Sequence, residues 1–193
     1  VISPLLGTLA AFILMTLIIK IFRKQNATYA NRYFKRLQLL SAAAYSLSHG
    51  GNDAQKTMGI VAVLLFSSGY LGSEFYGPFW VAMMAHLAIA LGTLSGGWRI
   101  IRTMGGKITK LDPMHGFSAE TAGAAVIIGS TFFGIPVSTT HVIAGSIIGV
   151  GATRRLSAVR WGLARRIMWT WIITIPAASG MAAMLYFIFS LVM

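Results

Sequence analysis

The segment LQLLSAAAYSLSHGGNDAQKTMGIVAVLLF, residues 37–66, is apolar at both ends and strongly polar at its centre. The centre combines amides, a carboxylate and an ammonium with a pair of glycines, Gly50 and Gly51. A helix that spans a membrane needs about 20 residues, which this segment exceeds. Each glycine within a helix costs about 1 kcal/mol relative to alanine. We therefore predict a helix that is broken at 49–52 into two half-helices, about 37–48 and 53–66.

The chain as a whole has the composition of an α-helical membrane protein. Of its 193 residues, 56% are hydrophobic and only 10% are charged, whereas a soluble domain is about 25% charged. Its mean hydropathy is +0.73. The absence of cysteine excludes disulfides and thiolate metal sites. We predict an all-α, polytopic membrane protein with a single transmembrane domain over 1–193, whose spans cover about 3–22, 37–66, 78–97 and 167–192, with a helical hairpin over 117–152.

The net charge of +12 would suggest nucleic-acid binding in a soluble protein, but the placement of the charges favours a membrane. All but one of the 16 Lys and Arg fall in three clusters, which we assign to loops between the apolar segments. Cytoplasmic loops of membrane proteins carry this excess of positive charge. We expect a lipid bilayer around the chain and no nucleic-acid partner. The three basic clusters cover 20–36, 99–110 and 154–166.

Residues 117–152 begin and end beside basic clusters, so both ends are expected on the cytoplasmic side. They form two short apolar arms, about 117–132 and 138–152, joined by FGIPVS. A re-entrant hairpin fits arms of this length better than two full spans, although charge placement alone is compatible with either.

Asp53 is the first candidate site residue. A carboxylate at the middle of a span costs at least about 2.5–3.5 kcal/mol on insertion scales, and such residues mark ion or substrate paths. The plainer alternative is an ion pair with Lys56, three residues further on. Unwound backbone beside Asp53 would line a cavity, and the amide of Asn52 can donate or accept hydrogen bonds. We expect both residues to lie at a substrate or ion site.

The sequence GIPVSTTH, residues 134–141, supplies a second candidate site. Gly-Ile-Pro ends the first arm, and Ser138, Thr139 and Thr140 stand at the start of the second. Helix N-termini bind anions through unpaired N–H groups and a partial positive charge. The alternative is ordinary helix capping by Ser138. Because capping needs only one hydroxyl, we predict that the three hydroxyls bind an oxyanion.

Two further features have both functional and structural interpretations. Glu120, one turn into the first arm, could hold a cation, or could simply be favoured by the helix dipole near the membrane surface. Gly145 and Gly149 form a small-residue motif of the kind that lets membrane helices approach closely. We interpret these glycines as packing residues only.

Three other classes of function fit some of these residues. Ser138, His141 and Asp53 have the residue types of a hydrolytic triad, but the chain lacks the Gly-x-Ser-x-Gly elbow. His49 and Asp53 could ligate a metal, although a break at the intervening glycines would spoil helical geometry. A passive anion channel could use the hydroxyls without any cation. A discontinuous helix and a hairpin that carry such groups are most typical of a transporter, and we expect no enzymatic activity.

The segments GGNDAQKTMG, residues 50–59, and GFSAE…GIPVSTTHVIAGSIIGVG, residues 116–151, resemble the inorganic phosphate transporter (PiT) family of sodium- or proton-coupled symporters. The resemblance implies transport of inorganic phosphate, with Asn52, Asp53, Ser138, Thr139 and Thr140 around phosphate. It also implies that Asp53, Asn52 and Glu120 help to hold the coupling cation. Apart from sodium ions, no cofactor is implied. A sulfate or other oxyanion transporter remains the alternative within the transport class.

The family is built from two inverted halves, each with its own Asn-Asp motif, and this chain contains one such motif. The form NDAQK resembles the version found in the C-terminal half. We therefore expect the chain to be one half of an inverted-repeat transporter of the plasma (cytoplasmic) membrane. Its expected partners are the N-terminal half and, in a homo-oligomer, further copies of the transporter.

Overall fold

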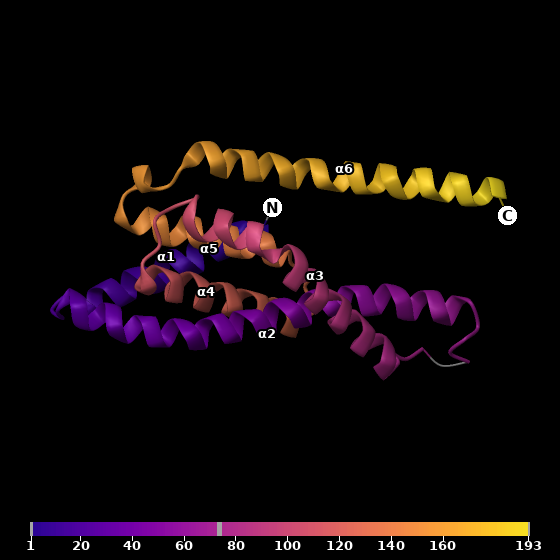
Figure 1. The fold of residues 1–193 in the computed structure, drawn as a ribbon, viewed down its shortest axis with the longest axis horizontal. Helices are drawn as coiled ribbons and strands as arrows, with labels where there is room; N and C mark the ends of the chain where they lie inside the picture. Colours follow the sequence, from indigo (N-terminus) through magenta and orange to yellow (C-terminus); the bar gives the residue numbers. More distant parts are fainter. Residues whose placement is uncertain (1, 73–74, 193) are drawn as a thin grey trace.

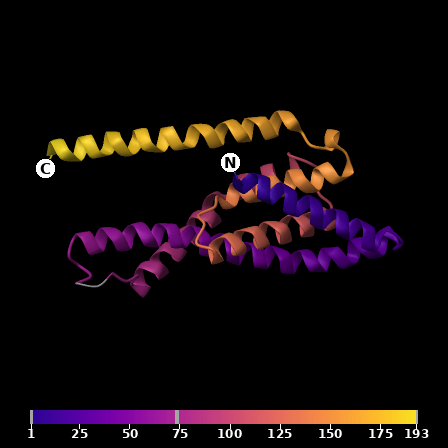
Figure 2. The same ribbon diagram turned by 180° about the vertical axis from the view of Figure 1, so that it is seen from behind.

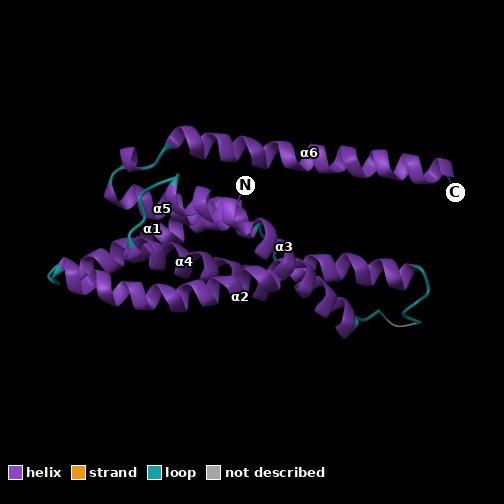
Figure 3. Cartoon of the chain, viewed as in Figure 1, coloured by secondary structure: helices purple, strands orange, loops and turns teal. Residues whose placement is uncertain are grey.

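The computed structural model describes residues 2–72 and 75–192, which are helical apart from the connections between helices (Figures 1 and 3). This confirms the predicted all-α class. In chain order the elements are α1 (Ile2–Phe22), α2 (Ala27–Ser67), α3 (Phe79–Gly106), α4 (Pro113–Phe132), α5 (Thr139–Arg154), the 3₁₀ turn η1 (Leu156–Ala158) and α6 (Trp161–Val192).

Helices α4 and α5 form a hairpin, and α1 and α2 pack against it to complete a four-helix bundle. On one side α1 packs against both arms of the hairpin, and on the other side α2 packs mainly against α4. The C-terminal part of α2 and the first part of α3 project together beyond the bundle, and α6 runs along one flank toward the C-terminus (Figures 1 and 2). The hairpin is thus held between two longer helices, which fixes the position of its turn.

Small residues allow α1 to lie directly against α5. A Cβ atom on Gly145 would lie 2.2 Å from the backbone oxygen of Pro4, and one on Gly149 would lie 2.3 Å from that of Thr8. The predicted packing role of the two glycines is therefore confirmed. Around this contact lies a core of small and aliphatic side chains: Ala11, Met15, Ala119, Ala122, Ile147 and Val150.

Three helical segments of the described chain are long and apolar enough to cross a membrane: Ile2–Phe22, Phe79–Trp98 and Trp161–Leu191. The arms of the hairpin are shorter, with 20 residues in α4 and 16 in α5. The connection between them turns at Gly134, whose φ of 68° lies in the left-handed region that favours glycine. The hairpin extends over 113–154, slightly beyond the predicted 117–152.

The predicted break of the second helix at 49–52 is wrong. The structure has one uninterrupted helix of 41 residues, α2, through Gly50 and Gly51. Helices in folded proteins are stabilised mainly by the packing of one face, and here the contact of α2 with α4 offsets the low propensity of the glycines. At 1.5 Å per residue α2 is about 60 Å long. Helix α2 begins within the first basic cluster. Three basic residues that were assigned to a loop therefore lie in this helix: Arg32, Lys35 and Arg36.

Replacing Gly51 by alanine tests the continuous helix. A Cβ atom on Gly51 would meet no atom of the described chain within 4 Å, and alanine favours a helix by about 1 kcal/mol over glycine. We expect Gly51→Ala to leave the thermal midpoint of the purified protein in detergent unchanged or slightly raised. A marked fall in the midpoint would instead indicate that the backbone must unwind at this position.

The open ends of the hairpin are joined by polar contacts. Asp112 caps the start of α4: it accepts a 3.0 Å hydrogen bond from the main-chain N–H of His115 and lies 2.5 Å from the Nδ1 atom of the same residue. The carboxylate of Asp112 also pairs with the guanidinium of Arg154 at the end of α5. Partial burial raises the pKa of Asp112, but the hydrogen bonds from His115 and the charges of His115 and Arg154 outweigh it, and the pKa falls from 3.8 to about 2. The start of α4 and the end of α5 are thus held together at one end of the hairpin.

This depressed pKa predicts how the hairpin responds to acid. The folded-state pKa lies below the unfolded value, so Asp112 contributes stability above 3.8, and this contribution is lost as the pH falls toward about 2. We expect Asp112→Asn to lower the thermal midpoint of the protein at neutral pH. The difference from wild type should then shrink as the pH falls through this window. A difference that is independent of pH would exclude the carboxylate charge as its cause.

Candidate substrate and ion site

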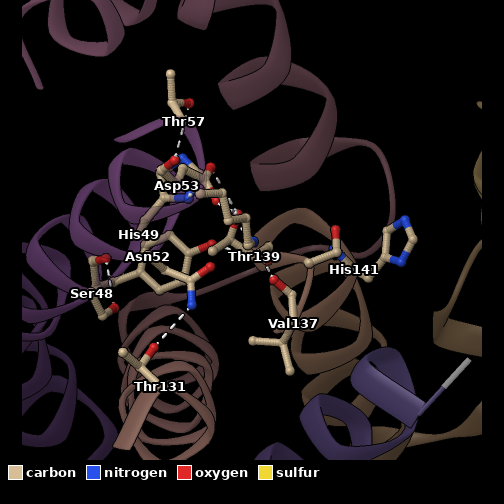
Figure 4. A network of polar contacts seen from close by, with 12 residues as sticks. Ser48, His49, Asn52, Asp53, Thr57, Thr131, Val137, Thr139 and His141 are labelled. Carbon is tan, nitrogen blue, oxygen red and sulfur yellow. Dashed lines mark hydrogen bonds and ion pairs between the residues drawn. The ribbon is translucent and has the colours of Figure 1, made fainter. Parts of the chain in front are cut away.

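The carboxylate of Asp53 on α2 faces the first turn of α5 (Figure 4). The hydroxyl of Thr139, the first residue of α5, lies 3.4 and 3.3 Å from the two carboxylate oxygens and can donate to them. Thr139 is buried, with 2% of its surface exposed, whereas the Asp53 side chain is 36% exposed. The structure therefore brings together two predicted site residues that are 86 positions apart in sequence, and leaves one face of the carboxylate open.

Two basic groups of α2 flank the same carboxylate. The Nδ1 atom of His49 lies 3.4 Å from Oδ2 of Asp53, and the Nζ atom of Lys56 lies 3.5 Å from Oδ1. Lys56 also donates a 2.6 Å hydrogen bond to the main-chain oxygen of Val137 in the hairpin turn. The simple ion pair considered from the sequence is present, but the same ammonium also ties α2 to the hairpin.

Asn52 lies beside Asp53 and contacts the other arm of the hairpin. Its Nδ2 group donates a 2.9 Å hydrogen bond to the hydroxyl of Thr131 near the end of α4. Its Oδ1 atom is buried and has no hydrogen-bond donor among the described residues. A cavity of about 200 Å³ adjoins Asn52, Lys56 and Thr131. Asn52 thus combines a side chain that adjoins a small cavity with a buried carbonyl oxygen that accepts no hydrogen bond from the described residues.

The three consecutive hydroxyls of the hairpin do not converge on one point. Ser138 caps α5 by accepting a hydrogen bond of 3.4 Å from the N–H of His141, and Thr139 faces Asp53. Thr140 is exposed and lines a cavity of about 590 Å³ together with Ser138 and His141. It also lines a cavity of about 540 Å³ together with Tyr45 and His49. The cause is helical geometry, since successive side chains of a helix point about 100° apart.

Glu120 lies apart from the group around Asp53, between α4 and α2. Its carboxylate accepts a 2.6 Å hydrogen bond from the hydroxyl of Ser41, and it lines a cavity of about 500 Å³ that reaches Asp112. Tyr45 lines the same cavity, donates a 3.4 Å hydrogen bond to the main-chain oxygen of Thr139, and stacks on the ring of His49. Tyr45 therefore contacts the Asp53 site and faces the cavity of Glu120.

Sequence reasoning missed Tyr45 and Thr131 as neighbours of the site. His49 lies four residues before Asp53, so the two side chains share one face of a continuous helix. Their contact could have been predicted if α2 had been expected to continue through the glycines. Nothing in the sequence pairs Thr131 with Asn52. Within the part of the chain that the structure describes, no cluster of three His, Cys, Asp or Glu could hold a metal ion, so the hypothesis of a metal site at His49 and Asp53 gains no further ligand.

The contact between Thr139 and Asp53 can be tested by removing one hydroxyl. Thr139→Val keeps the shape of the side chain and removes the donor, and because the Asp53 carboxylate is 36% exposed and can regain water, the loss is about 0.5–1.5 kcal/mol. We expect the phosphate affinity of the full-length protein, in which this hydroxyl positions Asp53, to fall by about 2- to 12-fold. Thr139→Ser, which keeps the hydroxyl, should remain close to wild type. Equal affinities for the valine and serine variants would remove this hydroxyl from the site.

The helical bundle, the hairpin and the three apolar segments that are long enough to cross a membrane are features of an integral membrane protein. Residues 20–182 match the model of the phosphate transporter family (PHO4). The chain therefore belongs to the phosphate transporter family, as its motifs had indicated. This membership excludes the enzyme class to which the hydrolase hypothesis belonged.

Several relatives are similar along the whole chain. A protein of Rhizobium meliloti named "Probable low-affinity inorganic phosphate transporter" is 59% identical over 192 residues, which is 100% of this chain and 58% of the relative. A Bacillus subtilis protein of the same name is 44% identical, with the same shares covered. A solved structure named "The sodium-dependent phosphate transporter" has a TM-score of 0.76 and 30% identity, over 92% of this chain and 46% of that chain. The chain thus spans about half the length of such proteins, and the expectation that it is one part of a longer transporter is confirmed.

Proposed function

We propose that the full-length protein, of which this chain is one half, moves inorganic phosphate across a membrane together with a cation, sodium or a proton. The observation that carries this proposal is the approach of Asp53 to Thr139 at the N-terminus of α5. The names of the relatives support phosphate as the substrate, and the name of the structural neighbour supports sodium as one candidate cation.

The start of α5 is suited to phosphate. The N–H groups in the first turn of a helix have no acceptor within the helix, and they carry a partial positive charge. Thr139 and Thr140 add hydroxyl donors there, and Ser138 fixes the start of the helix by capping it. We assign these three residues and the neighbouring Asn52 to the phosphate site, in which Ser138 acts mainly through the helix start.

The acidic residues explain why a cation accompanies phosphate. A carboxylate close to the site repels an anion, and the repulsion is strong where water is excluded. A cation held near Asp53, Asn52 or Glu120 offsets the repulsion, so phosphate binds well only together with its cation. The buried Oδ1 of Asn52, which has no hydrogen-bond partner among the described residues, and the cavity beside Glu120 are consistent with such a role. Coupling then follows from charge balance.

Inverted-repeat transporters place substrates at the interface between their halves. The open face of Asp53 would meet the corresponding elements of the other half in the full-length protein. We expect these 193 residues alone to be inactive after reconstitution, and the full-length protein to be active in the cytoplasmic membrane. Uptake by the isolated chain would contradict the two-half arrangement unless antiparallel cross-linking shows that two copies combine.

Uptake of radiolabelled phosphate by the full-length protein in liposomes tests the proposal. We expect uptake to depend on an imposed sodium or proton gradient and to resist competition by excess sulfate. Efficient competition by sulfate would favour a broader oxyanion transporter. Uptake without any gradient of a cation, driven by phosphate alone, would favour a passive channel. Absence of phosphate uptake under all of these conditions would refute the proposed function.

A further inference from the structure

Lys56 is the one basic residue outside the three clusters of Lys and Arg, and its ammonium lies where α2 meets the hairpin turn. Its Nζ atom is 3.5 Å from Oδ1 of Asp53 and donates a 2.6 Å hydrogen bond to the carbonyl oxygen of Val137. A positive charge on a side chain that is 42% exposed therefore lies next to a carboxylate of α2 and a main-chain carbonyl of the hairpin turn.

A carboxylate and a freed main-chain carbonyl are the oxygen ligands that a hard cation prefers. In transporters, carbonyls outside regular helices coordinate sodium next to the substrate. The carbonyl of Val137 belongs to such a segment, the non-helical connection 133–138. While the ammonium of Lys56 contacts both oxygens, a sodium ion at the same place would lose these ligands and would be repelled by a like charge.

We infer that Lys56 acts as a tethered cation that takes the place of a sodium ion at Asp53, and so determines the coupling-ion specificity of this half. This deepens the proposed function and rests on it. The lysine charge offsets the repulsion between Asp53 and phosphate without being transported. Any sodium that the full-length protein carries is then bound away from Asp53, at Glu120 or in the other half.

The lysine also has a mechanical consequence. Because Nζ bonds Val137 as well as pairing with Asp53, it holds the hairpin turn against α2. A sodium ion could leave and release this contact in each cycle, whereas Lys56 is attached to α2. The carboxylate of Asp53 therefore keeps its charge balance whether or not sodium is present, and the coupling by charge balance proposed above then applies to the carboxylate of Glu120 and to the other half.

The test compares the neutral variant Lys56→Gln with the charged variant Lys56→Arg in the purified full-length protein. The thermal midpoint is measured in sodium chloride and in choline chloride at equal ionic strength and pH. A cation that binds only the folded protein raises its midpoint in a saturable way. We expect Lys56→Gln to gain a sodium-specific rise over wild type. Lys56→Arg, and Lys107→Gln at an exposed lysine outside the site, should respond like wild type.

A second variant shows whether the gained sodium binds at the expected place. Asp53→Asn combined with Lys56→Gln should lose the gained sodium response, because the carboxylate ligand is absent. Lys56→Asn, which is shorter and neutral, should repeat the gain if Lys56→Gln folds poorly. An identical sodium response in wild type and both neutral variants would overturn the inference. A loss of phosphate affinity without any gain of sodium response would also overturn it, because Lys56 would then be a phosphate ligand.

These readouts separate the inference from the proposed function. The sodium-dependent midpoint requires no phosphate and no transport, so it reports on Lys56 even if the substrate is another anion. Phosphate uptake by the wild-type protein reports on the proposed function independently of sodium binding at Asp53. In liposomes, Lys56→Gln should additionally require sodium for uptake over a concentration range in which wild type does not respond.

Discussion

Replacing Asp53 by asparagine is expected to reduce cation-coupled phosphate uptake by the full-length protein roughly tenfold or more, because its carboxylate is the acidic group at the proposed phosphate site. Asparagine keeps the size of the side chain but removes its charge. The variant leaves the ammonium of Lys56 without its carboxylate and weakens the acceptor of the Thr139 hydroxyl. Uptake into liposomes, normalised to the amount of reconstituted protein, measures the effect.

Two controls give the Asp53→Asn result its meaning. The variant must insert and elute as a folded species at wild-type levels, which separates lost transport from lost protein. Ser46→Ala, at an exposed residue of the same helix, should transport normally. Wild-type uptake by Asp53→Asn would reduce Asp53 to a structural partner of Lys56.

Gly145→Ala is expected to destabilise the bundle strongly. The added Cβ would lie 2.2 Å from the backbone oxygen and 2.9 Å from the Cα of Pro4. No flexible side chain can move aside, so α1 and α5 must separate. Overpacking of this kind costs about 1–3 kcal/mol or more. We expect a clear fall in the thermal midpoint of the purified protein.

Gly129→Ala is the matched control, since it adds the same methyl group to a helical glycine of the hairpin. A Cβ on Gly129 would lie more than 4 Å from every other part of the chain that the structure describes, so the better helix propensity of alanine should leave stability unchanged or raise it by about 1 kcal/mol. Equal midpoints for the two variants would mean that α1 does not lie against α5 as described.

The sequence predicts the helical class, the hairpin and the family better than it predicts the shape of α2. Polar residues beside Gly50 and Gly51 suggest a break when only propensity is considered. The helix continues because it packs against α4 and because Asp53 has partners, Lys56 on its own helix and Thr139 in the hairpin. Tertiary contacts outweigh local propensity, and these contacts join residues too distant in sequence for periodicity to pair.

The candidate site shows the same limit at the level of single side chains. The hydroxyl motif marks the start of α5, yet only the structure shows that Thr139 faces Asp53 whereas Thr140 lines one cavity with Ser138 and another with His49. Tyr45 carries no sequence signal for its bond to the backbone of Thr139. By contrast, the sequence alone shows that Lys56 lies apart from the three basic clusters. Its contact with Val137 could not be predicted from the sequence.

Protection of a cysteine by phosphate tests the central claim, that the Asn52–Asp53 face of α2 and the start of α5 form the phosphate site. Gln55 is exposed and lines the same small cavity as Asn52, and this chain has no cysteine of its own. In full-length protein freed of other cysteines, phosphate should slow the alkylation of Gln55→Cys and leave that of Tyr70→Cys, on an exposed turn after α2, unchanged. Equal alkylation rates of Gln55→Cys with and without saturating phosphate would contradict the account.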